Sequence, residues 1–205
     1  KIDKTINQLK VTSAGSNDGK FASILFNSEE RLPNTFFWGM VSAEIDSITL
    51  EPTNIRYFAA PNTITQSADS LIAYINSLPN GKLLALAISD DAAQTVLGFS
   101  GGTPVRHAIE TLGSLYIDSV RYRESWCLLG VKGAAMGTVP ESYTKLFQGP
   151  AIIDTSLLVV NEEGHIVFPV ITKSTNWQNV FKRDSIPAGA SVEFIPLGIQ
   201  KNKTV

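Results

Sequence analysis

The sequence is poor in the residues that form disulfides and metal sites. Its 205 residues include one cysteine, Cys127, and two histidines, His107 and His165. A single cysteine excludes an internal disulfide and any site that needs several thiolates. The two histidines lie far apart in the sequence, so we expect neither a metal nor a cofactor. Cys127 lies within the apolar run "WCLLGV" and is expected to be a small buried residue.

Long apolar runs and a strong excess of charge are also missing. No run approaches the roughly 20 residues that a membrane-spanning helix needs. The opening "KIDKTINQLK" lacks the apolar centre of a signal peptide. Basic and acidic residues nearly balance, 17 against 19, for a net charge of -2, and we expect neither nucleic acid nor a membrane as partner. Because the chain begins with Lys1 rather than Met, we expect a mature form or a piece of a longer protein.

Short apolar runs between many turn residues indicate a β-rich domain, since the chain holds 15 Gly and 10 Pro. The runs "LLALAI" (83–88) and "WCLLGV" (126–131) are continuous and of strand length, which is typical of central strands covered on both faces. Apolar residues at helical spacing predict two short helices. One covers "SADSLIAYINSL" with Ser67 as its cap, and the other covers "TPVRHAIETLG" with Thr103 as its cap.

The pattern changes near residue 155. The stretch "SLLVVNEEGHIVFPVI" is typical of a β-hairpin, and "IPAGASVEFIPLG" is typical of a turn followed by a strand. We therefore assign a domain to residues 8–155 and a β-strand extension to residues 156–205. The sequence leaves open whether this extension folds alone or belongs to a second β unit.

One motif points to serine hydrolysis. The sequence "GFSGG" (98–102) matches the G-x-S-x-G nucleophile elbow, and Asp154 and His165 follow in the chain order of a triad. The elbow needs a strong strand that runs into its serine, however, and "QTVLGF" is a weak one. The alternating β-α pattern of a parallel sheet is also missing. We expect a flexible loop here and no enzymatic activity.

Polar residues flank the two central strands, since "AISDDA" ends the first and "YRES" begins the second. If the strands are antiparallel neighbours, Asp90 or Asp91 lies near Arg123. One interpretation is structural, with an ion pair or a carboxylate that accepts hydrogen bonds from loop amides. The other is a polar pocket at the rim of the sheet with Tyr122 and Trp126 as aromatic neighbours. A guanidinium, a carboxylate and an aromatic ring suit the hydroxyls and the apolar face of a sugar.

A series of short motifs follows in a fixed order along residues 67–135. A helix leads to a "PNG" turn, an apolar strand and the acidic pair 90–91; a second helix ends in "LGS", and "RESW" opens an apolar strand that ends in "GVKG". In order and spacing this segment resembles the interleukin-like EMT inducer/PANDER (ILEI/PANDER) family, in the form found in large secreted bacterial proteins. The resemblance extends more loosely to the strands upstream.

The resemblance implies a β-rich α+β fold in which two curved antiparallel sheets, arranged like a sandwich, are flanked by two short helices. Members are non-catalytic and secreted or lumenal, which implies a secreted or cell-surface location and neighbouring domains of a larger chain as partners. In the stem region of a Golgi N-acetylglucosaminyltransferase, this domain holds sugar ligands through its acidic and arginine motifs. The implied partner is thus a glycan of N-acetylglucosamine type.

By position, these motifs imply a ligand site formed by Asp90 and Arg123, with Asp91 and Glu124 adjacent. Trp38 stands where the family usually has an arginine before a glycine. The sequence leaves open whether Trp38 stacks on a sugar or belongs to the core. We predict a non-catalytic extracellular carbohydrate-binding domain. The alternative is a protein-interaction or architectural spacer domain of a large secreted or surface protein.

Overall fold

The computed structural model describes residues 4–59 and 64–160. In chain order its elements are β1 (Lys4–Gly15), β2 (Phe21–Phe26), β3 (Glu29–Glu30), β4 (Gly39–Ile45), β5 (Pro52–Phe58), α1 (Ile64–Ser77), β6 (Leu83–Asp90), the π-helical turn η1 (Ala93–Leu97), α2 (Pro104–Glu110), the 3₁₀ turn η2 (Ile117–Ser119), β7 (Ser125–Val131), β8 (Glu141–Thr144) and β9 (Ala151–Val160).

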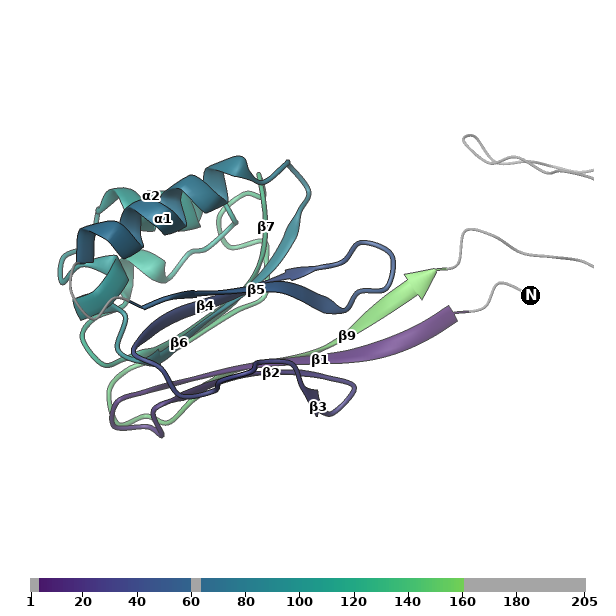
Figure 1. Cartoon of the computed structure of the whole chain (residues 1–205), viewed down its shortest axis with the longest axis horizontal. Helices are drawn as coiled ribbons and strands as arrows, with labels where there is room; N and C mark the ends of the chain where they lie inside the picture. Colours follow the sequence, from purple (N-terminus) through teal and green to yellow (C-terminus); the bar gives the residue numbers. More distant parts are fainter. Residues whose placement is uncertain (1–3, 60–63, 161–205) are drawn as a thin grey trace, which may run out of the picture. The chain divides into compact units, whose positions relative to one another are not determined.

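The strands form one mixed, curled sheet, with a few short helices (Figure 1). Its path is β3-β2-β1-β6-β4-β5, while β9 pairs with β1 and β7 pairs with β6 and β8. All pairs are antiparallel except a short parallel bridge, in which Ala14 and Gly15 of β1 pair with Ser89 and Asp90 of β6. The expected arrangement of two separate antiparallel sheets is therefore not confirmed, because this bridge joins the two antiparallel groups of strands.

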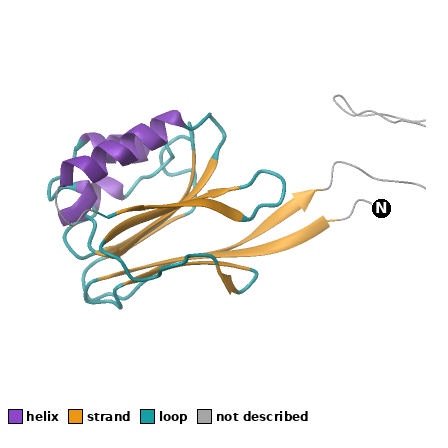
Figure 2. Ribbon diagram, in the orientation of Figure 1, coloured by secondary structure: helices purple, strands orange, loops and turns teal. Residues whose placement is uncertain are grey.

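Two apolar cores lie on opposite faces of the central strands. The helices α1 and α2 cover one face (Figure 2), and β1 and β2 cover the other. Successive residues of β6 alternate between the cores, so Leu84 and Leu86 join the helical core while Ala85 and Ala87 join the core against β1 and β2. Because both faces are covered, β6 and β7 are continuous apolar runs, as predicted.

Both predicted helices are present, with differences at their starts. α1 begins at Ile64, ahead of Ser67, so Ser67 lies within the helix, nearly buried, and its predicted role as cap is wrong. Thr103 does occupy the cap position of α2, with Pro104 at the first helical position. Its hydroxyl, however, accepts no hydrogen bond from the N–H groups of the helix and instead donates to the carbonyl oxygen of Leu97 at 2.9 Å. No helix among the described residues is long and apolar enough to cross a membrane.

Arg106, on α2, is a fully buried charged residue. Its guanidinium donates to the carbonyl oxygens of Gly98 and Val120 at 2.9 Å, of Leu97 at 3.3 Å, and of Ile117. Burial lowers the pKa of Arg106, but an arginine remains charged at any ordinary pH. One side chain therefore ties the ends of η1 and η2 to α2.

β9 carries the described chain past the expected domain boundary. It pairs with β1 along its length, from Ala151 opposite Ser13 to Val160 opposite Lys4. The boundary assigned between residues 155 and 156 falls inside this strand. Residues 161–205, which contain the predicted hairpin turn and the last predicted strand, lie outside the described residues.

Cys127 should be unreactive in the folded protein. Its side chain is fully buried in β7, and burial raises the pKa of the thiol to about 12, so the reactive thiolate is scarce. We expect N-ethylmaleimide to label the native protein at least about 100-fold more slowly than the protein unfolded in guanidinium, as followed by mass spectrometry. Equal labelling rates in the two states would contradict this burial.

Candidate functional site

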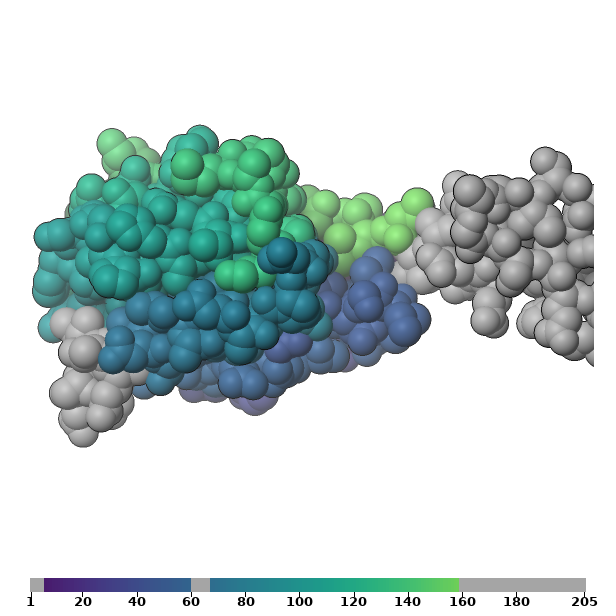
Figure 3. All heavy atoms as spheres, turned by 90° about the horizontal axis from the view of Figure 1, so that it is seen from above, coloured from purple at the N-terminus to yellow at the C-terminus, as the bar shows by residue number. Residues whose placement is uncertain are grey.

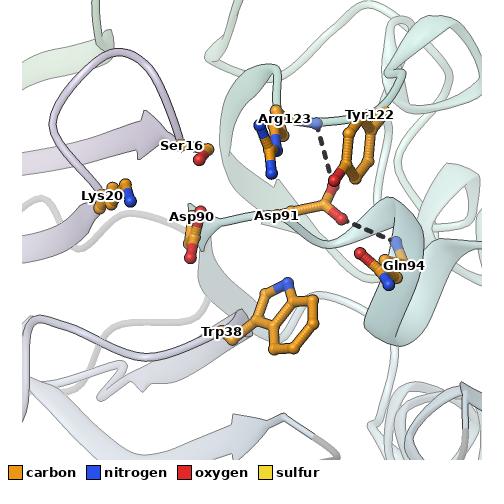
Figure 4. Close-up of a pocket in the computed structure, with 8 residues that line it drawn as sticks. All are labelled: Ser16, Lys20, Trp38, Asp90, Asp91, Gln94, Tyr122 and Arg123. Carbon is orange, nitrogen blue, oxygen red and sulfur yellow. Dashed lines mark hydrogen bonds between the residues drawn. The ribbon is translucent and has the colours of Figure 1, made fainter.

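The ends of four strands meet around a small hollow at the surface. The hollow has a volume of about 230 Å³ and is lined by Ser16, Lys20, Trp38, Asp90, Asp91, Gln94, Tyr122 and Arg123 (Figure 4). Because β1 and β6 are parallel where they pair, both end at this edge of the sheet. β4 and β7 are antiparallel to β6, so both begin there.

The antiparallel pairing of β6 with β7 brings the two predicted polar clusters together. Figure 4 shows Arg123 and Trp38 on opposite sides of the hollow, with Asp90 between them. Arg123 is exposed, and its guanidinium carbon lies 4.8 Å from the centroid of the Tyr122 ring. The ion pairs found within the described ranges do not involve Arg123, Asp90 or Lys20. The predicted ion pair is thus not formed, and these charged groups face the hollow.

Asp91 has a structural role in addition to its place in the hollow. It is 2% exposed. One carboxylate oxygen accepts hydrogen bonds from the backbone N–H groups of Ala93 and Arg123, both at 3.0 Å, and the other accepts from the N–H of Gln94 at 3.0 Å. These contacts agree with the structural interpretation, in which a carboxylate accepts hydrogen bonds from loop amides. It fixes the start of η1 and the backbone of Arg123 at the edge of the hollow.

Glu124 does not line the hollow. Its nearly buried carboxylate accepts hydrogen bonds from the N–H of Arg121 at 2.7 Å and from the hydroxyl of Tyr143 at 2.6 Å. Burial, together with this carboxylate, raises the pKa of Tyr143 to about 12. Glu124 therefore holds the turn before β7. The predicted aromatic neighbour Trp126 is also elsewhere, since it is fully buried and its indole N–H donates to Glu141 at 2.7 Å.

Three residues of the hollow have left-handed backbone conformations. The φ angles are 59° at Lys20, 63° at Asp90 and 63° at Arg123. For a residue other than glycine this conformation costs about 1–2 kcal/mol, and it persists only where the surrounding structure imposes it. Five other non-glycine residues among those described also have a positive φ, so this conformation is not confined to the hollow.

Gly15 allows β1 to approach the Arg123 turn closely. A Cβ on Gly15 would lie 2.1 Å from the carbonyl oxygen of Arg123. Two serine hydroxyls bridge the strands at this point, because Gly15 N–H donates to Ser125 at 2.9 Å and Trp126 N–H donates to Ser13 at 3.0 Å. This close approach, which only glycine permits at position 15, therefore joins the end of β1 to the turn that carries Arg123.

Trp38 is 44% exposed and lines the hollow, so it does not belong to the core. Sequence reasoning missed Ser16, Lys20 and Gln94. Ser16 and Lys20 lie on the turn between β1 and β2, for which "SNDGK" is a good turn signal. That signal carries no information about which strand ends the turn will meet.

The residues of the suggested hydrolase triad are only partly described. Ser100 lies exposed in the loop of residues 98–102. Asp154 lies in β9, where it accepts a hydrogen bond from Gln8. His165 lies outside the described residues. Within residues 4–59 and 64–160, no group of three or more His, Cys, Asp or Glu side chains is placed to hold a metal.

Fold and hollow together define a β-rich domain with a curled mixed sheet, helices on one face and a polar hollow where strand ends meet. Residues 39–134 match the family described as interleukin-like EMT inducer. The match confirms the resemblance to this family over that part of the chain. The matched segment includes Asp90, Asp91 and Arg123, but Trp38 and the β1–β2 turn precede it. No curated protein sequence matches the chain.

Proposed function

We propose that the domain binds carbohydrate without a chemical step, and that the hollow is its sugar site. The observation that carries the proposal is the convergence of the Arg123 guanidinium, the Asp90 carboxylate and the Trp38 indole on one open hollow. A guanidinium only donates hydrogen bonds and a carboxylate only accepts them, whereas sugar hydroxyls do both. The face of an indole ring packs against the apolar face of a pyranose.

The size and rigidity of the hollow support a small ligand. Its volume of about 230 Å³ is below the roughly 300–1,000 Å³ of pockets for drug-sized ligands, and it suits a single sugar ring. Asp91 holds the backbone of Arg123 in place, so little ordering remains to be done when a ligand binds.

The proposed setting is extracellular, in a larger secreted or surface protein of a bacterium. Neighbouring domains of that protein would be partners, and the ligand would be a glycan of N-acetylglucosamine type. These parts of the proposal rest on the family resemblance alone.

Arg123→Ala should abolish glycan binding with little effect on stability. The side chain is exposed, and the backbone N–H that binds Asp91 is kept. Loss of charge-assisted hydrogen bonds should weaken binding at least about 30-fold, measured on a glycan array and by calorimetry with the best sugar. The thermal midpoint should shift by less than about 2 °C.

Arg56→Ala is the matched control, because Arg56 is also exposed and also lies over a tyrosine ring, with its guanidinium carbon 4.5 Å from the centroid of Tyr74. It does not line the hollow, so its sugar affinity should equal that of the parent. A drop in thermal midpoint of more than about 5 °C in Arg123→Ala alone would assign Arg123 a structural role instead.

One observation favours a second function, protein interaction through the outer face of β1 and β9. Ile6 and Leu158 are directly opposite each other, and are 69% and 50% exposed. Figure 3 shows β9, in light green, extending beyond the helices. Exposed apolar patches mark interaction surfaces. A glycan array without any signal would favour this function.

A further inference from the structure

Phe99 is an exposed aromatic residue next to the hollow that plays no part in the proposed site. Its ring centroid lies 5.9 Å from that of Tyr122, with the ring planes at 51°. Tyr122 in turn lines the hollow and carries the guanidinium of Arg123 over its ring. Phe99 is 56% exposed and Tyr122 is 40% exposed. The two rings therefore form a continuous surface that leads out of the hollow, here called the aromatic ledge.

The loop that carries Phe99 is held at both ends. The carbonyl oxygen of Gly98 accepts a hydrogen bond from the buried Arg106 at 2.9 Å, and the N–H of Gly102 donates to Asp118. Because these contacts hold the loop, the ring of Phe99 stays exposed to water, and the favourable free energy of burying it is not gained. Large exposed aromatic side chains on an ordered surface are typical of binding sites.

The volume of the hollow limits what it holds. About 230 Å³ suits one sugar ring, so any further ring of the ligand lies outside the hollow, and the ledge begins where Tyr122 borders it. We infer that the ligand is an oligosaccharide of at least two residues, whose first ring occupies the hollow and whose second ring stacks on Phe99 and Tyr122. This inference rests on the proposed function of the hollow.

Calorimetry on the 205-residue chain tests the inference. The probes are N-acetylglucosamine, glucose, galactose and mannose, each as a monosaccharide and as its β-linked homodisaccharide. We expect the preferred disaccharide to bind more tightly than its monosaccharide. Phe99→Ala should weaken disaccharide binding about three- to tenfold and leave monosaccharide binding unchanged. Phe99→Tyr keeps the ring and should restore the affinity for the disaccharide.

Phe147→Ala is the matched control, since Phe147 is 72% exposed and does not line the hollow; it should change neither affinity. Equal binding of monosaccharide and disaccharide by the parent chain overturns the ledge while the hollow remains a sugar site. An equal loss of monosaccharide and disaccharide affinity in Phe99→Ala also overturns the ledge. Absence of binding to every probe overturns the proposed function and the ledge with it.

Discussion

Replacement of Arg106 by methionine should lower the free energy of unfolding by about 4 kcal/mol. The guanidinium donates to four backbone carbonyl oxygens, and the hydrogen bonds to Leu97, Ile117 and Val120 are buried. Methionine fills much of the space but donates no hydrogen bond, and each hydrogen bond from a charged group that is lost costs about 1.5–3 kcal/mol, less where the carbonyl keeps a second donor, as at Leu97. Urea denaturation followed by tryptophan fluorescence measures the change.

Two further variants separate the hydrogen bonds of Arg106 from its charge. Arg106→Lys keeps the charge but has three N–H donors on one atom instead of a planar fork, so we expect an intermediate loss of stability. Arg121→Met is the control, because Arg121 is exposed and also donates to backbone carbonyls; its effect should stay below about 1 kcal/mol. If Arg106→Met is no less stable than Arg121→Met, the carbonyls do not depend on the guanidinium.

The sequence predicts the central part of the fold because burial on both faces leaves a visible pattern. β6 and β7 are continuous apolar runs, and helical spacing of apolar residues marks α1 and α2. Antiparallel pairing of β6 and β7 then places Arg123 beside the acidic pair. This prediction needs only the antiparallel direction of the two strands, and their pairing in the structure confirms it.

The parallel bridge between β1 and β6 leaves no such pattern. It depends on a close approach at Gly15 and on the hydroxyls of Ser13 and Ser125, which meet residues more than a hundred positions away. Glycine and serine at a strand end are also common turn residues, so their composition suggests a loop. The same bridge brings Ser16 and Lys20 to the hollow, and they are missed for the same reason.

The two acidic residues of the hollow look alike in sequence and differ in structure. Asp90 ends β6 with φ at 63°, and this left-handed turn directs the next residue inward. Asp91 is consequently buried and bound to three backbone N–H groups, whereas Asp90 remains partly exposed in the hollow. Neither apolar periodicity nor charge spacing distinguishes two adjacent aspartates.

Substitutions at this pair should therefore have opposite effects on stability and the same effect on binding. Asp91→Ala leaves three N–H groups without their acceptor and should lower the free energy of unfolding by about 3 kcal/mol. It should also abolish sugar binding, because the backbone of Arg123 and the start of η1 lose the bonds that position them. Asp91→Asn retains one acceptor oxygen and should therefore recover part of the stability and part of the sugar binding.

Asp90→Gly removes a carboxylate that lines the hollow and relieves the left-handed strain of a residue with a Cβ. Sugar binding should be lost, while the free energy of unfolding should rise by up to about 1 kcal/mol. Urea denaturation and calorimetry on Asp90→Gly and Asp91→Ala side by side test this contrast. A loss of stability in Asp90→Gly as large as that in Asp91→Ala would mean that Asp90 also supports the fold. Because a structural carboxylate and the proposed ligand-binding carboxylate are neighbours here, only the combination of both measurements assigns their roles.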